Sequence, residues 1–335
     1  MTEFSNDAPL FEVRDLRVAF RMGNSFQEAV RGINLSVSSG EVLGIVGESG
    51  SGKSVGMLAA LGLLPDGARV TGSVRFRGRE LIGLPRRELR KLRGARIGMI
   101  FQDPLSSLNP VMTVGDQLAE ALQLHNDGLS QRAALARATG LLELVAIPQP
   151  DRRLRQYPHE FSGGMRQRVM IAMAVANNPD ILIADEPTTA LDVTVQAQIM
   201  DVLAELRGRL KLGLILITHD LGVLAGHADR VAVIYSGEVV EQAGINELFR
   251  QPGHPYTRGL IASIPNMAVQ RERLFSIDGS PPALGGHPGG CAFHPRCVMA
   301  QDICRRLAPP VLAAPGAAAH QAACHFAFSV PEATA

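Results

Sequence analysis

The sequence predicts an α/β protein built on a mostly parallel sheet, and two observations lead to this class. Short apolar segments alternate with segments of helical periodicity through most of the chain, as in sheets that helices cover on both faces. The motif G-x4-G-K-S at Gly47–Ser54 follows one apolar segment and precedes a helical one. With 335 residues the chain is long enough for about two domains of roughly 150 residues each.

In chain order, the strand signals are alternating or continuous apolar runs. The expected strands are Leu10–Phe20, Gly32–Val37, Glu41–Val46, Val70–Phe76, Arg96–Phe101, Ile181–Ala184, Leu214–Ile217 and Val231–Tyr235. A helix is expected from Lys53 to about Leu64, where a Pro-Asp-Gly turn stops it. The apolar stripe of a later helix covers Val195–Leu210.

Between residues 113 and 176 the sequence is mostly helical. Val114, Leu118, Ala121 and Leu122 recur at the spacing of one helix face. We therefore expect a helical subdomain, at about residues 105–176, inserted between two strands of the sheet.

The charge balance and the N-terminus exclude several classes of protein. The chain has 33 basic and 32 acidic residues, whereas proteins that coat nucleic acid or anionic lipid usually have a basic excess. The N-terminal residues MTEFSNDAPL lack the pattern of a signal peptide. No apolar run approaches the roughly 20 residues of a membrane helix. We expect a soluble, cytoplasmic chain that reaches a membrane only through a partner.

The glycine-rich motif has the composition of a phosphate-binding loop. Its backbone amides and the N-terminus of the following helix supply positive potential for phosphate oxygens. Lys53 is predicted to bridge the β- and γ-phosphates of a nucleotide, and the Ser54 hydroxyl to bind Mg²⁺. The predicted loop residues are Gly47, Glu48, Ser49, Gly50, Ser51, Gly52, Lys53 and Ser54.

A second motif consists of the apolar run Ile181–Ala184 followed by Asp185 and Glu186. A buried strand that ends in two carboxylates places them at the carboxyl edge of a sheet, where α/β folds bind ligands. Asp185 is predicted to hold the Mg²⁺ shell, and Glu186 to orient and activate a water molecule that attacks the nucleotide.

Four further features accompany these two motifs: the segment Phe161–Arg168 (FSGGMRQR), Gln102 after a strand, Ala190–Asp192 after the acidic pair, and His219 after a later strand. In this combination and order the chain resembles the ATPase subunits of ABC transporters. The resemblance covers roughly residues 10–250. It implies a P-loop nucleotide-binding domain at residues 1–250, with a mostly parallel sheet, an antiparallel β subdomain and a helical subdomain.

The resemblance also implies roles for single residues. Phe20 would stack on adenine, and the ATP-binding set would extend to Val55. Gln102 would contact Mg²⁺ and the attacking water, and His219 would contact the γ-phosphate and support catalysis. The residues implied to act on the site of a partner subunit are Ser162, Gly163, Gly164 and Asp192.

A narrower resemblance is to the importers of oligopeptides, dipeptides, nickel and glutathione. It rests on Gln102–Pro110, Tyr157–Glu160 and Gly253–Thr257. It implies a heterodimer with a second, different ATPase subunit, two integral permeases and a periplasmic binding protein that delivers the solute. The chain would then be peripheral, at the cytoplasmic face of the inner membrane. Phe161 and Met165 depart from the commonest signature, which is typical of one of the two ATPase types.

After about Arg250 the sequence is rich in Gly, Pro and Ala, yet this part contains every cysteine. The four thiols, Cys291, Cys297, Cys304 and Cys324, suggest a metal centre in a reducing compartment. By chemistry alone, zinc and a [4Fe–4S] cluster both take four cysteines. The peptide-importer resemblance favours iron–sulfur. We expect residues 251–335 to form an extension separate from the phosphate loop, so that ATP binding would survive loss of the metal.

Two rival functions are an ABC ATPase that acts on nucleic acid in repair and the ATPase of an exporter. The first usually has a long coiled coil or insertion between the phosphate loop and the signature, and this chain has no heptad run there. The second is disfavoured because no membrane span is fused to the chain and because the C-terminal extension is of the importer kind.

Overall fold

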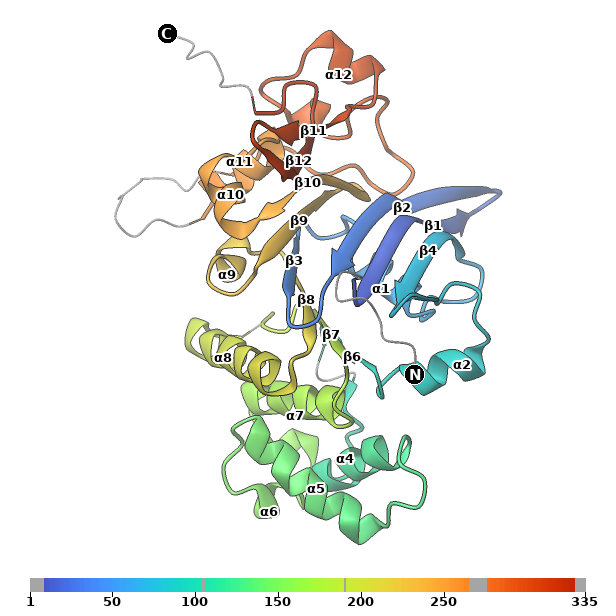
Figure 1. The fold of residues 1–335 in the computed structure, drawn as a ribbon, viewed down its shortest axis with the longest axis vertical. Helices are drawn as coiled ribbons and strands as arrows, with labels where there is room; N and C mark the ends of the chain where they lie inside the picture. Colours follow the sequence, from blue (N-terminus) through green and yellow to red (C-terminus); the bar gives the residue numbers. More distant parts are fainter. Residues whose placement is uncertain (1–8, 104–106, 190, 265–275, 329–335) are drawn as a thin grey trace. The chain divides into compact units, whose positions relative to one another are not determined.

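The structure is a computed structural model that describes residues 9–103, 107–189, 191–264 and 276–328 (Figure 1). The chain forms two compact units, each assembled from separate segments. Unit 1 consists of Met1–Phe11, Val37–Glu41 and Phe76–Ile217. Unit 2 consists of Glu12–Ser36, Val42–Arg75 and Thr218–Ala335.

Unit 1 contains three parallel strands in the order β6 (Ile97–Ile100), β7 (Ile181–Asp185) and β8 (Gly213–Thr218). Every residue of β7 and β8 is buried, which explains why both strands are continuous apolar runs in the sequence. The strands expected from those runs are confirmed.

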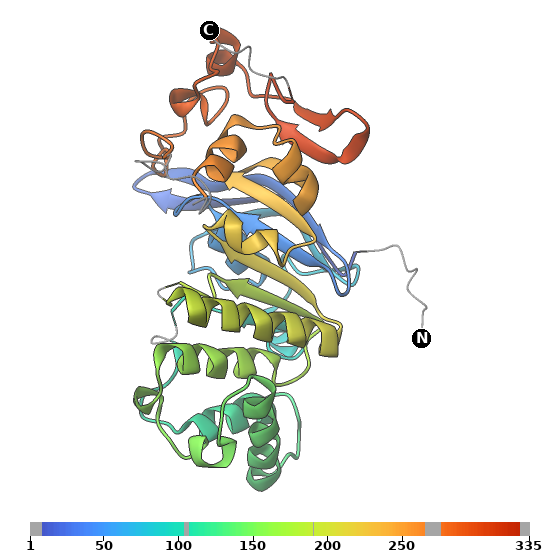
Figure 2. The same ribbon diagram turned by 90° about the vertical axis from the view of Figure 1, so that its left-hand side faces the viewer.

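The rest of unit 1 is mostly helical. Its further elements are β5 (Arg79–Glu80), α2 (Arg86–Leu92), α4 (Val114–Gln123), α5 (Gln131–Leu144), α6 (Pro150–Arg153), η1 (Pro158–Glu160), α7 (Gly163–Val175) and α8 (Val193–Leu210). Helices α7 and α8 lie side by side in both views (Figure 2). The helices expected between residues 113 and 176 are present, whereas residues 104–106 of the expected importer motif lie outside the described residues.

Two features of the sequence build these helices. Thr113 and Ser130 are the N-cap residues of α4 and α5, and each side chain accepts a hydrogen bond from a backbone amide in the first turn. The two helices and the C-terminal end of α7 share a core of small and branched apolar residues, which are completely or almost completely buried. This core includes Ala119, Leu122, Ala134 and Ala176.

Unit 2 contains strands from two sheets. The first has the order β2 (Ser25–Val37), β1 (Phe11–Met22) and β4 (Arg69–Phe76). In the second, β3 (Val42–Val46) pairs in parallel with β9 (Arg230–Tyr235), and β10 (Glu238–Gly244) pairs antiparallel with β9.

The C-terminal part of unit 2 is more regular than its composition suggests. Strand β12 (Ala317–Ala323) pairs antiparallel with both β10 and β11 (Val311–Ala314), although five of its seven residues are alanine. The helical elements of unit 2 are α1 (Lys53–Ala60), α9 (Leu221–Ala225), α10 (Ile245–Arg250), α11 (Pro255–Ala262), η2 (His294–Arg296) and α12 (Asp302–Arg306). The sequence did not predict β10, β11 or β12.

The helix after the glycine-rich loop is shorter than expected. It ends at Ala60 instead of continuing to Leu64, because Gly62 takes a left-handed conformation with φ of 61° and its amide bonds back to Ala59. A left-handed glycine just after the last turn is a common way to end a helix.

Candidate nucleotide site and cysteine cluster

The glycine-rich loop between β3 and α1 has a backbone path that only glycine permits at two positions. A Cβ atom on Gly47 would overlap the carbonyl oxygen of Ile234. Gly52 has φ of 97°, and a Cβ there would lie 2.6 Å from the carbonyl oxygen of Ala29. The motif therefore specifies a tightly packed loop, as an anion cradle of backbone amides requires.

Lys53 and Ser51 place polar groups inside this loop. Lys53 is 5% exposed, and its Nζ donates to the carbonyls of Gly47 at 2.7 Å and Glu48 at 2.8 Å. The Ser51 residue is 2% exposed, and its buried Oγ has no hydrogen-bond partner in this part of the structure. Buried polar atoms normally have partners, so an unpaired hydroxyl here fits a loop made for a polar ligand.

The other predicted ATP contacts of unit 2 lie on the expected elements. Ser54 and Val55 follow Lys53 in the first turn of α1, and both are half-buried. Phe20 is half-buried on β1, although its two predecessors are buried in the core. His219 follows the end of β8 and is exposed. The roles assigned to these residues stay predictions.

The acidic pair at the end of β7 is joined by Gln102 within unit 1. Asp185 is 5% exposed at the last position of the strand. The Glu186 carboxylate accepts hydrogen bonds from Gln102 Nε2 at 2.9 Å and from Thr189 Oγ1 at 2.7 Å. The sequence predicted Gln102 and Glu186 separately, and the structure brings their side chains together.

The backbone of Glu186 is unusual, with φ of 47°. A non-glycine residue in the left-handed region costs about 1–3 kcal/mol, and such strain is enriched at functional sites. The Glu186 amide donates to the carbonyl of Ile217 at 2.9 Å, which holds this conformation.

The signature segment forms the start of α7. Ser162 is the N-cap residue, and its Oγ accepts from the amide of Met165 at 3.3 Å. A Cβ on Gly164 would lie 2.6 Å from Val195, whereas one on Gly163 would meet only Leu191 at 3.6 Å. Asp192 is the N-cap residue of α8 and accepts from the amide of Val195 at 2.9 Å. The N-cap role of Asp192 was not predicted.

The four cysteines converge in unit 2. Cys291, Cys297, Cys304 and Cys324 line one small cavity, and all four are free thiols. Burial, with a smaller effect of the neighbouring thiols, raises the pKa of Cys291 to about 11. Within the described ranges, no group of three or more Cys, His, Asp or Glu side chains is arranged to hold a metal ion.

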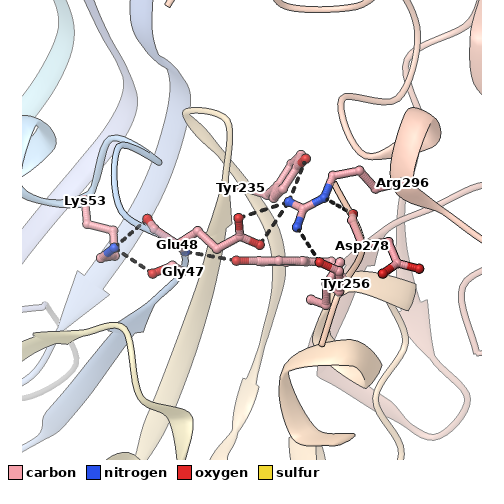
Figure 3. A network of polar contacts seen from close by, with 8 residues as sticks. Gly47, Glu48, Lys53, Tyr235, Tyr256, Asp278 and Arg296 are labelled. Carbon is pink, nitrogen blue, oxygen red and sulfur yellow. Dashed lines mark hydrogen bonds and ion pairs between the residues drawn. The ribbon is translucent and has the colours of Figure 1, made fainter. Parts of the chain in front are cut away.

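A further set of residues contacts the loop and was not assigned from the sequence. Arg296 and Tyr256 hydrogen-bond to Glu48, and Tyr235 lies beside them (Figure 3). Tyr256 belongs to the Gly253–Thr257 motif, which was used only to recognise a subfamily. Arg296 had no sequence signal beyond its position next to a cysteine.

The family comparisons identify the class of protein that this site belongs to. A family model described as ABC transporter matches residues 30–189. A solved ATP-binding cassette, described as a dimeric post-hydrolysis state bound to ADP and phosphate, is 30% identical with a TM-score of 0.62. That comparison covers 70% of this chain and 98% of the cassette. The chain belongs to the ABC transporter family, and its predicted α/β fold class is confirmed.

Within that family the chain is similar to the ATP-binding proteins of peptide transporters. A second family model, described as oligopeptide/dipeptide transporter, C-terminal region, matches residues 240–304. The oligopeptide transport ATP-binding protein OppD of Salmonella typhimurium is 49% identical over 321 residues, which cover 94% of this chain and 96% of that protein. OppD of Escherichia coli is 51% identical over 302 residues, which cover 90% and 89%.

OppD of Mycobacterium tuberculosis is 54% identical over 318 residues, which cover 95% of this chain. The chain spans about half the length of the mycobacterial relatives, 52% in each case. In the part of the chain that the structure describes, no helix has the length and apolar character needed to cross a membrane.

Proposed function

We propose that this chain is the ATP-hydrolysing subunit of an importer that carries oligopeptides, dipeptides or a related solute. One observation carries the proposal. The chain that contains the glycine-rich loop around Lys53 is 49% identical to Salmonella OppD, and the match covers 96% of that protein. The loop supplies the nucleotide chemistry, and the relatives' names supply the solute class.

The contacts of the two units support distinct steps of hydrolysis. In unit 2 the ammonium of Lys53 would leave the carbonyls of Gly47 and Glu48 for the β- and γ-phosphates, while Ser54 would be a ligand of Mg²⁺. Bound Mg²⁺ would neutralise phosphate charge.

In unit 1 the Glu186 carboxylate would accept a proton from the attacking water. The amide of Gln102 and the hydroxyl of Thr189 would orient that carboxylate through the hydrogen bonds they donate to it. Asp185 would hold the coordination shell of Mg²⁺, and Gln102 would contact the ion. His219 would assist at the γ-phosphate.

We infer that the working unit is a pair of ATPase subunits beneath two permeases. The solved cassette that resembles this chain is dimeric. Ser162 and the two glycines after it open α7, where backbone amides can bind a phosphate presented by another subunit. The second ATPase would be a different chain, and a periplasmic binding protein would deliver the solute. The subunit would then lie at the cytoplasmic face of the inner membrane.

The cysteines are proposed to hold a [4Fe–4S] cluster. Four free thiols around one cavity provide the ligand number that such a cluster needs. A single zinc ion, which also takes four cysteine ligands, is the alternative. The resemblance to peptide importers is what favours the cluster over zinc.

Reconstitution tests the function. The full chain would be co-expressed with the two permeases, the second ATPase and the binding protein of a peptide importer, and the complex placed in liposomes. We expect ATPase activity that a loaded binding protein stimulates, and uptake of a labelled peptide that Lys53→Ala abolishes. Failure to co-purify with any permease, together with activity stimulated by DNA ends, would replace the importer with the repair function.

A further inference from the structure

The phosphate loop is connected to the cysteine segment by a partly buried ion pair. Arg296 Nη1 donates to both carboxylate oxygens of Glu48, at 2.9 and 3.0 Å (Figure 3). The Arg296 side chain is only 6% exposed, and that of Glu48 is 26% exposed. Because one partner is buried and the other half-buried, water screens this pair less than it screens a surface pair, and the two charges interact more strongly.

Arg296 is fixed from its own side. Its Nε donates to the carbonyl of Asp278 at 2.9 Å, and Nη2 to that of Ile277 at 3.3 Å. The guanidinium also donates to the hydroxyl of Tyr235 and lies 5.9 Å from the ring centre of Phe293. The planar fork of arginine is thereby held in one orientation, which a lysine could not reproduce in full.

Glu48 is held at two further points. Its amide donates to the Tyr256 hydroxyl at 2.9 Å, and its carbonyl accepts from Lys53 Nζ at 2.8 Å. One residue of the loop therefore links Arg296 and Tyr256, which follow the ATPase core in sequence, to the lysine that is proposed to bind phosphate.

The charge of Glu48 gives this contact a consequence for binding. A carboxylate in a loop that binds a polyphosphate repels the ligand, and an arginine paired with it cancels most of that repulsion. The alternative is that the ion pair only docks the cysteine segment against the loop and has no effect on ATP binding. Removing both charges distinguishes the two explanations. If the arginine neutralises Glu48, replacing both residues by neutral ones removes the repulsion and restores ATP binding. If the pair only docks the segment, the neutral pair does not restore the docking.

We propose that Arg296 is a positioning residue of the nucleotide site, which neutralises and orients Glu48 and so makes ATP affinity depend on the cysteine segment. Because Arg296 directly precedes Cys297, we expect a change at the cysteines to displace the guanidinium. This inference rests on the proposed ATPase function. It reverses the expectation that ATP binding is indifferent to loss of the cysteine cluster.

The test measures KM for ATP, kcat and melting temperature of the full chain in its complex. We expect Arg296→Gln to raise KM roughly tenfold with a smaller change in kcat, within the 5–150-fold range of coupling between sites. Arg296→Lys should raise KM less. The double variant Glu48→Gln/Arg296→Gln should return KM to within about threefold of wild type. Arg306→Gln, an exposed arginine of the same segment, is the matched control and should not alter KM.

Cys297→Ser extends the test to the segment itself. It should raise KM in the wild-type background and much less in the Glu48→Gln/Arg296→Gln background. An unchanged KM in Arg296→Gln overturns the inference, and so does a double variant as impaired as Arg296→Gln alone. If Arg296→Gln does not fold, Arg296→Lys is compared in the wild-type and the Glu48→Gln backgrounds; its effect on KM should be smaller in the second, where no carboxylate remains to be oriented. Wild-type protein that binds no ATP would instead refute the proposed function.

Discussion

Replacing Gly163 with Asp separates folding from assembly. Gly163 is the first residue of α7, and a Cβ there meets only Leu191, at the ordinary contact distance of 3.6 Å. A carboxylate in the first turn of a helix stabilises it by about 0.3–1 kcal/mol through the helix dipole. The variant should therefore melt at or slightly above the wild-type temperature.

The same carboxylate should prevent ATP-driven pairing. If this face of α7 meets a γ-phosphate held by the partner ATPase, two like charges face each other in a closed site, at a cost of several kcal/mol. A cost of about 3 kcal/mol corresponds to a loss of roughly a hundredfold in closed dimer. ATP binding to the chain's own loop should remain, because Gly163 is not one of the residues proposed to bind that nucleotide.

The assay combines calorimetric melting, nucleotide binding and ATPase activity of the reconstituted complex. Gly163→Asn has nearly the same shape without the charge and should lose far less activity. Gly164→Asp is the contrasting variant, since its Cβ would lie 2.6 Å from Val195 and should lower the melting temperature. Wild-type transport by Gly163→Asp would refute the shared-site reasoning.

Three further variants test single assignments. Lys53→Ala removes the ammonium from the loop and should weaken nucleotide binding and reduce hydrolysis to background; normal turnover would remove the loop from the site. Glu186→Gln should slow hydrolysis by about 10²–10⁴-fold while ATP still drives subunit association, and loss of association would make Glu186 structural. Anaerobically purified protein should be brown, with absorbance near roughly 400 nm and about four irons per chain, and Cys297→Ser should bleach it. One zinc per colourless chain would replace the cluster.

The parts of the fold that the sequence predicted are those that local rules determine. Strands β7 and β8 are buried throughout, so apolar runs reveal them without knowledge of their neighbours. The loop glycines were predicted because the motif encodes close approach of the backbone to phosphate oxygens, and this role stays a prediction; the structure adds that a Cβ on Gly47 would overlap the carbonyl oxygen of Ile234. Site residues were predicted where a single continuous sequence motif contains them.

The parts that were missed depend on distant partners. Strand β12 has little intrinsic strand propensity, and it forms because β10 and β11 offer hydrogen bonds on both sides. Arg296 and Glu48 are separated by 248 positions in the sequence. An arginine and a glutamate that far apart give no sequence signal that they are in contact. Such pairs are visible only once the fold has been built.

Glu241 shows why the C-terminal segment should not be treated as a detachable tail. The residue is 1% exposed, and its carboxylate accepts from the amides of Gly253 and His254, at 2.6 and 2.8 Å. His320 Nε2 lies 2.7 Å from the same group, on the strand that pairs with β10. A chain cut after Arg250 would lose these partners and the pairing with β12.

We therefore expect truncation after Arg250 to lower the melting temperature, and Glu241→Val to act in opposite directions in the two chains. In the full chain the valine leaves three buried polar groups without an acceptor and should cost about 3–5 kcal/mol, as breaking a buried pair does. For a chain of 335 residues the melting temperature falls by about 1.4 °C per kcal/mol, so the expected fall is roughly 4–7 °C. In the truncated chain the valine removes a carboxylate that has lost its hydrogen-bond partners, and it should raise the melting temperature. If Glu241→Val destabilises both chains equally, the carboxylate does not depend on the C-terminal segment, and residues 1–250 fold as an independent unit.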